Sequence, residues 1–434
     1  MDYGIIILII SFFTLLFIGV PVAYCVGIST TLTLVTSILT APALTTVAQR
    51  MATAMDSFTL LAIPFFVLAG QLMNRGGIAN RLIDFAKAMV GWIPGGLTFV
   101  NILSNMLFGS ISGSAVASAT AIGGIMNDKM VDEGYDKGFI TSINVTSATT
   151  GLLIPPSNVL IVYSLASGGA SIAALFVAGY IPGILMGLVL MMVAGYQSYK
   201  KGIKSTELVS VKVFFSLFLK ALPSLMLLVI VIGGIVGGLF TATEASAIAV
   251  IYTFVLSVFI YKEIGLKDLR KVFLETAVTT SIVLFLVAAS IAMSWMLSFE
   301  SIPQNVSNAL IGLTDNKIVL LLIINLVLLV VGVFMDITPA ILIFTPIFLP
   351  VMVAQGVSPV HFGIFMVMNL CVGLCTPPVG TLLFVGCSIS EISITKVLKP
   401  ILPFYAAMFT VLLLTTYIEE ISLWLPRVLL GFGG

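Results

Sequence analysis

The chain carries the stretch Gly151-Leu-Leu-Ile-Pro155-Pro156-Ser157-Asn158, and a related stretch, Gly373-Leu-Cys-Thr-Pro377-Pro378-Val-Gly380, follows 222 residues later. Each copy lies within a long apolar run that holds few charges. Two consecutive prolines lack two helix hydrogen-bond donors and clash with the preceding turn. Each run is therefore predicted to be a membrane helix that is broken in its middle. Two proline kinks used only for packing are the alternative interpretation.

Backbone groups that a broken helix leaves free are tolerated at membrane depth only inside protein or beside a wet cavity. Paired breaks at matching places in two halves of a chain are typical of the binding site of a secondary transporter. The two proline stretches therefore point to a transport function. A non-transporting membrane scaffold is another possibility, but it would not need two matched breaks.

The composition is that of an integral membrane protein. Of the 434 residues, 59% are hydrophobic and 9% are charged, whereas a soluble domain is about 25% charged. The net charge of +1 gives no reason to expect a nucleic acid partner. The sequence has no phosphate-binding loop and no His/Glu metal cluster or serine–lysine pair at membrane depth, so we expect neither ATP hydrolysis nor enzymatic activity.

The apolar runs divide into predicted spans. The charge-free run from Tyr3 to Gln49 is long enough for two spans of about 20 residues each, and a short interfacial piece, residues 50–56, follows it. Further spans are predicted for residues 58–73, 171–196, 221–261 (two spans), 276–295 and 400–417. The amphipathic stretches 75–87 and 301–313 are too polar to span and are expected to lie along the membrane surface.

Two other runs predict re-entrant hairpins. Residues 94–127 are charge-free but too few for two full spans, and Gly and Ser at 109–114 suit a turn. The broken helix 138–167 follows. In the second half, a hairpin is predicted for residues 318–350 and a broken helix for residues 361–387. The predicted fold is an all-α membrane protein with about 10–11 transmembrane helices and two re-entrant hairpins.

Each half of the chain is expected to cross the membrane five times. An odd number of crossings places residues 207–434 upside down relative to residues 1–206, as in the inverted repeats of secondary transporters. The basic stretches 200–204 and 262–271 share one side because two spans separate them, and the positive-inside rule makes that side cytoplasmic. Both termini are then expected to face the periplasm.

A broken helix presents free carbonyl groups on one half and free N–H groups on the other. Carbonyl oxygens suit sodium, and helix N-termini suit carboxylates. We expect the substrate to contact the polar side chains of the hairpin tips and breaks: Ser110, Ser112, Ser114, Ser157, Asn158, Asp336 and Thr338. We expect sodium ions to bind among the oxygen atoms of Gly109, Ser112, Pro155, Ser157, Met335, Asp336, Gly373, Thr376, Pro378 and Gly380.

Some of these polar groups also have a purely structural interpretation. The serines of residues 110–114 are small enough to serve close helix packing. Asp336 lies deep in apolar sequence, where ionisable residues are costly and usually functional, but it is also placed to cap the returning helix of its hairpin. Glu244 follows a glycine-rich junction and is expected to have a structural role.

Several motifs together resemble one known family. They are Gly19-Val-Pro21-Val-Ala23, Phe108-Gly109-Ser110-Ile-Ser112-Gly113-Ser114-Ala115, Ile154-Pro155-Pro156-Ser157, Gly238-Leu-Phe240-Thr241-Ala-Thr243-Glu244-Ala245, Met335-Asp336-Ile-Thr338-Pro339-Ala340 and Thr376-Pro377-Pro378-Val-Gly380. Over nearly its whole length the chain resembles the large membrane subunit of tripartite ATP-independent periplasmic (TRAP) transporters. The family often has a proline where this chain has Ala242.

The resemblance implies a specific machinery in the bacterial inner membrane. A periplasmic binding protein would deliver an organic acid, such as sialic acid or a dicarboxylate, and a small four-helix membrane subunit would pair with this chain. Sodium ions would drive import, and the hairpins and broken helices would slide as an elevator against the remaining helices. A stand-alone sodium- or proton-coupled anion transporter without a binding protein is the alternative.

Overall fold

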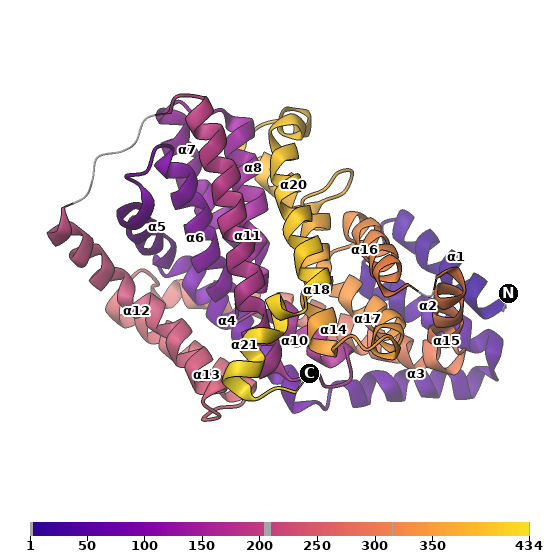
Figure 1. Cartoon of the computed structure of the whole chain (residues 1–434). Helices are drawn as coiled ribbons and strands as arrows, with labels where there is room; N and C mark the ends of the chain where they lie inside the picture. Colours follow the sequence, from indigo (N-terminus) through magenta and orange to yellow (C-terminus); the bar gives the residue numbers. More distant parts are fainter. Residues whose placement is uncertain (1–2, 204–209, 315, 434) are drawn as a thin grey trace.

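The computed structural model describes residues 3–203, 210–314 and 316–433, and within these ranges the regular structure is entirely helical (Figure 1). The boundary expected between the two halves, at residues 206 and 207, lies outside the described residues. The first half contains α1 (Tyr3–Phe17), α2 (Val22–Ser37), α3 (Thr40–Ala54), the 3₁₀ turn η1 (Phe58–Leu61), α4 (Ala62–Arg75), α5 (Ile78–Val90), α6 (Gly96–Ser112), α7 (Ala115–Asp132), α8 (Lys137–Ala148), α9 (Thr150–Leu153), α10 (Asn158–Ala166) and α11 (Ile172–Lys200).

The second half follows the same plan of long helices, one hairpin and one broken helix. It contains α12 (Val211–Val236), α13 (Ala242–Phe254), the π-helical turn η2 (Val255–Ile260), α14 (Leu266–Phe299), α15 (Ile302–Leu313), α16 (Lys317–Phe334), α17 (Ile337–Ala354), α18 (Pro359–Leu374), α19 (Thr381–Ser390), α20 (Ile394–Tyr417) and α21 (Glu420–Leu430).

Many of these helices cross a distance comparable to a bilayer. Among the described residues, eight helices are long and apolar enough to span a membrane, or nine if α8–α9 and α10 count as one bent span. The axis of that span bends by 52° at the break between its two parts. The chain is therefore an all-α, multi-pass membrane protein.

The N-terminal region differs from the expected pair of long spans. The charge-free run 3–49 forms α1 and α2, of 15 and 16 residues, and then enters a third helix, α3. The expected interfacial piece 50–56 is mostly the end of α3. The two expected helices are present and divide at residues 18–21, as predicted. They are shorter than expected because Pro42 fits the first turn of a third helix, where its missing N–H costs nothing. In Figure 1, α3 runs along the lower edge of the molecule, where it packs on α2 and α14.

Local sequence explains where several helices begin. Asp136 caps α8, because its carboxylate accepts a hydrogen bond from Phe139 N at 3.0 Å. Thr241 and Glu244 form a reciprocal capping box at the start of α13. Glu244 therefore has the structural role that the sequence suggested.

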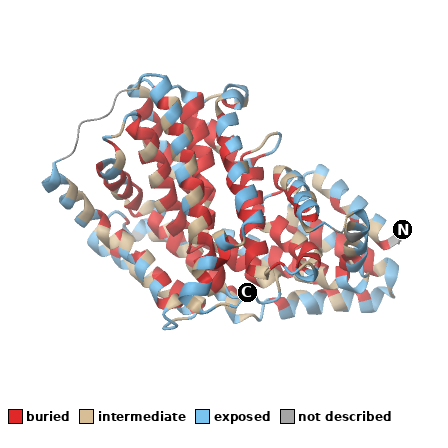
Figure 2. Ribbon diagram, viewed as in Figure 1, coloured by how far each residue is buried: buried red, intermediate tan, exposed pale blue. Residues whose placement is uncertain are grey.

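The broken helices form the centre of the molecule. Every residue of α18 from Val360 to Leu374 is buried, and so is every residue of α8 from Gly138 to Ala148. Figure 2 shows the buried residues gathered in the upright bundle, where α6, α8, α11 and α18 lie, whereas α12 and α3 carry many exposed residues. The long helix α14 packs on α2, α3, α4 and α17, so it joins the N-terminal helices to the second hairpin.

Candidate functional site

The first hairpin turns at Gly113 and Ser114, a few residues later than the middle of the Gly/Ser run. Gly113 adopts φ +62°, a left-handed conformation that favours glycine. The Ser114 hydroxyl then caps α7 by accepting a hydrogen bond from Ala117 N at 3.2 Å. Gly109 and Ser110 consequently lie in the last turns of α6 and not at the tip.

The first break separates α9 from α10 at the tandem prolines. Because prolines 155 and 156 have no N–H, they cannot donate to the carbonyls of Gly151 and Leu152, one turn earlier. The Leu152 carbonyl instead accepts a hydrogen bond from the Ser157 hydroxyl at 2.6 Å. Ser157 is fully buried, so its hydroxyl stabilises the break from within.

The second hairpin and break repeat this arrangement. The hairpin turns at Met335 and Asp336, and the Asp336 carboxylate caps α17 by accepting from Ile337 N at 2.9 Å. In the break between α18 and α19, Thr376 O accepts a hydrogen bond from Gly380 N at 3.0 Å. The Cys375 carbonyl accepts one from the Tyr405 hydroxyl. The capping role proposed for Asp336 as an alternative is thus present in the structure.

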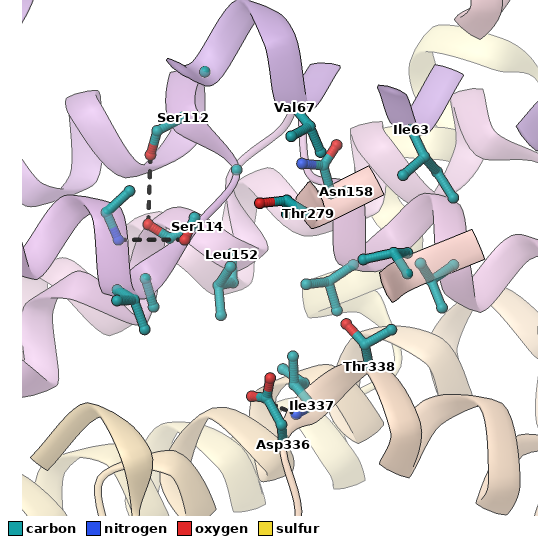
Figure 3. A pocket seen from close by; sticks show the side chains of 18 of the residues that line it. Ile63, Val67, Ser112, Ser114, Leu152, Asn158, Thr279, Asp336, Ile337 and Thr338 are labelled. Carbon is teal, nitrogen blue, oxygen red and sulfur yellow. Dashed lines mark hydrogen bonds between the residues drawn. The ribbon is translucent and has the colours of Figure 1, made fainter. Parts of the chain in front are cut away.

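A cavity of about 270 Å³ opens between the two hairpin tips (Figure 3). Its lining comes from both hairpins, both broken helices, α4 and α14. The lining residues are Ile63, Val67, Gly70, Gln71, Asn74, Ser112, Gly113, Ser114, Ala115, Val116, Ala117, Leu152, Asn158, Val159, Val162, Thr279, Val283, Asp336, Ile337, Thr338, Leu374, Thr381 and Leu382.

The cavity lies where four helices begin. The lining includes the first residues of α7 (Ala115), α10 (Asn158), α17 (Ile337) and α19 (Thr381). Side-chain caps from Ser114 and Asp336 occupy the starts of α7 and α17, but α10 and α19 have no side-chain cap. Free N–H groups at a helix N-terminus carry partial positive charge. The N-termini of α10 and α19 therefore offer the cavity two positions that favour an anion.

The charged groups of the cavity are few. Among the described lining residues, Asp336 is the single ionisable side chain, and neither Lys nor Arg lines the wall. An anionic ligand would consequently be held by backbone N–H groups, hydroxyls and amides. It would also lie in the same cavity as the Asp336 carboxylate, whose charge opposes its binding unless a cation is present.

The structure brings five of the seven predicted substrate-binding residues to this one cavity, and two lie elsewhere. Those in the lining are Ser112, Ser114, Asn158, Asp336 and Thr338. Ser110 is buried in α6, where its hydroxyl donates to Leu107 O at 2.8 Å. Ser157 is also absent from the lining because its hydroxyl is bound to Leu152 O.

The residues predicted to hold sodium ions surround the breaks, and two of them line the cavity. Ser112 and Asp336 are in the lining, whereas Gly109, Pro155, Ser157, Met335, Gly373, Thr376, Pro378 and Gly380 are not. The Ser112 hydroxyl lies 3.5 Å from Gly109 O and 3.4 Å from Ser114 O, distances typical of weak hydrogen bonds. Three oxygen atoms therefore gather at the end of α6, a donor set that suits a hard cation.

Sequence reasoning missed the lining residues on α4 and α14. Gln71 and Asn74 lie one turn apart on α4, and Thr279 lies on α14. Polar side chains within otherwise apolar helices were the available signal. Thr381, at the start of α19, was also missed, although it directly follows the second proline motif.

The comparisons with known proteins agree with one another. The family model described as "Tripartite ATP-independent periplasmic transporter, DctM component" matches residues 9–421. The chain is 55% identical to "Uncharacterized protein YgiK" of Salmonella typhimurium, over 98% of each chain. It is 36% identical to "C4-dicarboxylate TRAP transporter large permease protein DctM" of Rhodobacter capsulatus, over 96% of this chain and 97% of that one. It is 37% identical to "Sialic acid TRAP transporter large permease protein SiaM" of Vibrio cholerae, over 89% and 90%.

A solved structure supports the fold independently. The YdaH transporter of Alcanivorax borkumensis, whose crystal structure was described as having an unusual topology, matches with a TM-score of 0.61 over 90% of this chain and 88% of that one. The sequences are 14% identical, so this likeness concerns the fold alone. The family model spans nearly all of the chain and describes a transporter, not an enzyme. The chain is therefore a member of the DctM family, the large membrane component of TRAP transporters.

Proposed function

We propose that this chain imports an organic acid, of the sialic acid or dicarboxylate type, across the bacterial inner membrane together with sodium ions. The observation that carries the proposal is the convergence of two uncapped helix N-termini, those of α10 and α19, on one cavity. These N-termini favour a carboxylate without a fixed positive side chain. Binding of this kind is reversible enough for a transporter that must release its cargo.

Sodium is proposed as a co-transported substrate. An organic acid in the cavity would experience repulsion from Asp336, and a bound cation would cancel it. The oxygen atoms of Gly109, Ser112 and Ser114 supply donors that sodium prefers. On this proposal, sodium and the acid stabilise each other in the cavity, so each raises the affinity of the other by the same factor.

Alternating access is proposed to come from sliding of one body against another. The hairpins and broken helices form the cavity on one side, and α4 and α14 close it on the other. We propose residues 1–206 and 207–434 as inverted repeats. The matched hairpins, breaks and glycine contacts of the two halves support this division. The hairpins and breaks would then move together as an elevator along α4 and α14.

The proposed partners rest on membership of the TRAP family, and the proposed orientation rests on the positions of the basic residues. A small four-helix membrane subunit and a periplasmic binding protein are proposed as partners, and both termini are proposed to face the periplasm. Exposed apolar side chains on α1, α12 and α14, including Ile10, Val229 and Ile282, are available to the bilayer or to the small subunit.

Uptake into proteoliposomes tests the proposal. The chain would be reconstituted with its small subunit, and uptake of labelled succinate and sialic acid would be followed with and without the binding protein. We expect uptake only with an inward sodium gradient and the binding protein. Uptake that persists in sodium-free buffer would contradict sodium coupling, and uptake without any binding protein would favour a stand-alone anion transporter.

A further inference from the structure

A second hollow lies outside the central cavity, in a groove of about 580 Å³ between α11 and α20. None of the residues that line it also lines the central cavity. Its α11 wall has two parts. Val189, Met192 and Val193 form an apolar part, and Gln197, Lys200 and Lys201 form a polar part near the end of the helix.

The two parts follow one another along a single face of α11. Residues 189, 193, 197 and 200 recur at helical spacing, so their side chains form a continuous stripe. At a rise of 1.5 Å per residue, the apolar part lies about 10–16 Å deeper along the helix than Lys200. The groove therefore has a charged mouth and a long apolar interior.

The mouth of the groove offers three groups that suit an anion. The amide nitrogen of Gln197 is buried and has no hydrogen-bond partner among the described residues. An unpaired buried donor of this kind is costly unless a ligand satisfies it. Lys200 forms no ion pair with any residue in the described ranges. The Lys201 ammonium lies 4.5 Å from the centre of the Phe139 ring, a cation–π contact that keeps it close to α8.

We propose that this groove binds an anionic phospholipid. The phosphate would accept hydrogen bonds from the Gln197 amide and contact the Lys200 and Lys201 ammonium groups. One acyl chain would lie along Val189, Met192 and Val193. A soluble phosphate ion would satisfy the mouth but leave the apolar interior open, so the geometry favours a lipid. Basic pockets between membrane helices bind anionic headgroups in this manner.

The position of the groove links the lipid to the broken helices. α11 packs against α9 and α18, and α20 packs against α8 and α18. A phospholipid in the groove would therefore be attached to the body that contains both breaks. The lipid contact concerns a different part of the chain from organic acid transport and is tested separately from it.

Lipid retention by the purified full-length chain provides the test. The protein would be exchanged into detergent with equal amounts of phosphatidylglycerol and phosphatidylcholine, and bound lipid would be measured by native mass spectrometry. We expect preferential retention of phosphatidylglycerol. A basic side chain near a charged lipid surface contributes about 1 kcal/mol, so affinity should fall about fivefold for each of Lys200→Gln and Lys201→Gln.

Four further measurements test whether the groove itself holds the lipid. Lys212→Gln with Lys271→Gln removes two exposed lysines outside the groove and should leave lipid retention unchanged. Val189→Trp, which keeps both lysines but fills the apolar part, should reduce retention. Glycerol phosphate, which lacks acyl chains, should not displace the lipid. Equal retention of the two phospholipids, or equal loss in groove and control variants, would overturn the proposal. Loss of the lipid once the small subunit is bound would show that a protein helix covers the groove instead.

Discussion

Gly109 and Gly151 lie backbone against backbone, so close that a Cβ atom on Gly109 would lie 2.8 Å from the Cα of Gly151. The same relationship recurs in the second half, where a Cβ atom on Gly332 would lie 3.2 Å from the Cα of Gly373. In each half, the first arm of the hairpin is thus pressed against the helix just before the proline break. Glycine is required at these contacts to bring the hairpin tip and the break to one place.

The first prediction concerns this contact. Gly109→Ala should lower both stability and transport, because the added methyl group meets backbone atoms that cannot rotate away. Overpacking of this kind costs about 1–3 kcal/mol. The measurement is the thermal unfolding midpoint in detergent, together with uptake in proteoliposomes.

Gly124→Ala is the matched control for that prediction. Gly124 lies in α7, and a Cβ atom there would meet nothing within 4 Å. The control should be neutral or slightly stabilising, since alanine favours a helix by about 1 kcal/mol over glycine. Equal midpoints for the two variants would show that the glycine contact is unimportant.

The second prediction separates two serines of the same helix. Ser112→Ala removes a hydroxyl that lines the cavity and lies near two carbonyl oxygens, so it should raise the sodium concentration needed for half-maximal uptake. Ser110→Ala removes a hydroxyl bound within its own helix and should leave sodium dependence unchanged. Sodium titration of uptake measures both effects. The proposed ion position is wrong if the two variants behave alike.

The third prediction separates the charge of Asp336 from its capping role. Asp336→Asn keeps an effective N-cap for α17 but removes the negative charge. It should preserve the folded protein and weaken the dependence of uptake on sodium, because the acid no longer needs a cation to cancel the charge of residue 336. Asp336→Glu should retain more of the sodium dependence than Asp336→Asn. If uptake by the Asp336→Asn variant depends on sodium as it does in the wild type, capping of α17 is the only function of the Asp336 side chain.

The fourth prediction assigns Glu244 to stability alone. Glu244→Ala breaks the capping box with Thr241 and should lower the thermal unfolding midpoint. Glu244→Gln can still form the reciprocal hydrogen bond and should be close to wild type in thermal unfolding. Neither change should alter the sodium titration of the uptake that remains. A shifted titration would place Glu244 in the transport cycle.

The features that could be predicted from sequence are those with a local cause. Tandem prolines in the interior of a helix kink or break it, so both breaks were predictable. The second hairpin turn at Asp336 was predictable because aspartate is a favoured helix N-cap and the sequence around it is apolar. The exact turn of the first hairpin was harder, because several Gly and Ser residues suit it, and the positive φ at Gly113 decides between them.

The features that could not be predicted depend on contacts between distant segments. Gln71, Asn74 and Thr279 line the cavity because α4 and α14 pack beside the hairpin tips. The sequences of these two helices contain no repeat or motif that predicts this packing. Ser110 and Ser157 looked equivalent to Ser112 in sequence. Their hydroxyls are instead bound to backbone carbonyls, which becomes visible only once the helices are in place.

The central claim is that the N-termini of α10 and α19 bind the transported acid together with sodium. The most direct test is whether the acid protects a cysteine in the cavity from chemical labelling. Thr381→Cys places a thiol at the exposed start of α19, and Leu398→Cys places one on an exposed face of α20 outside the cavity. Both would be labelled with a maleimide in the reconstituted transporter. We predict that the transported acid slows labelling at position 381 only when sodium is present and leaves position 398 unchanged. Labelling at position 381 that is the same with and without acid and sodium would contradict the account.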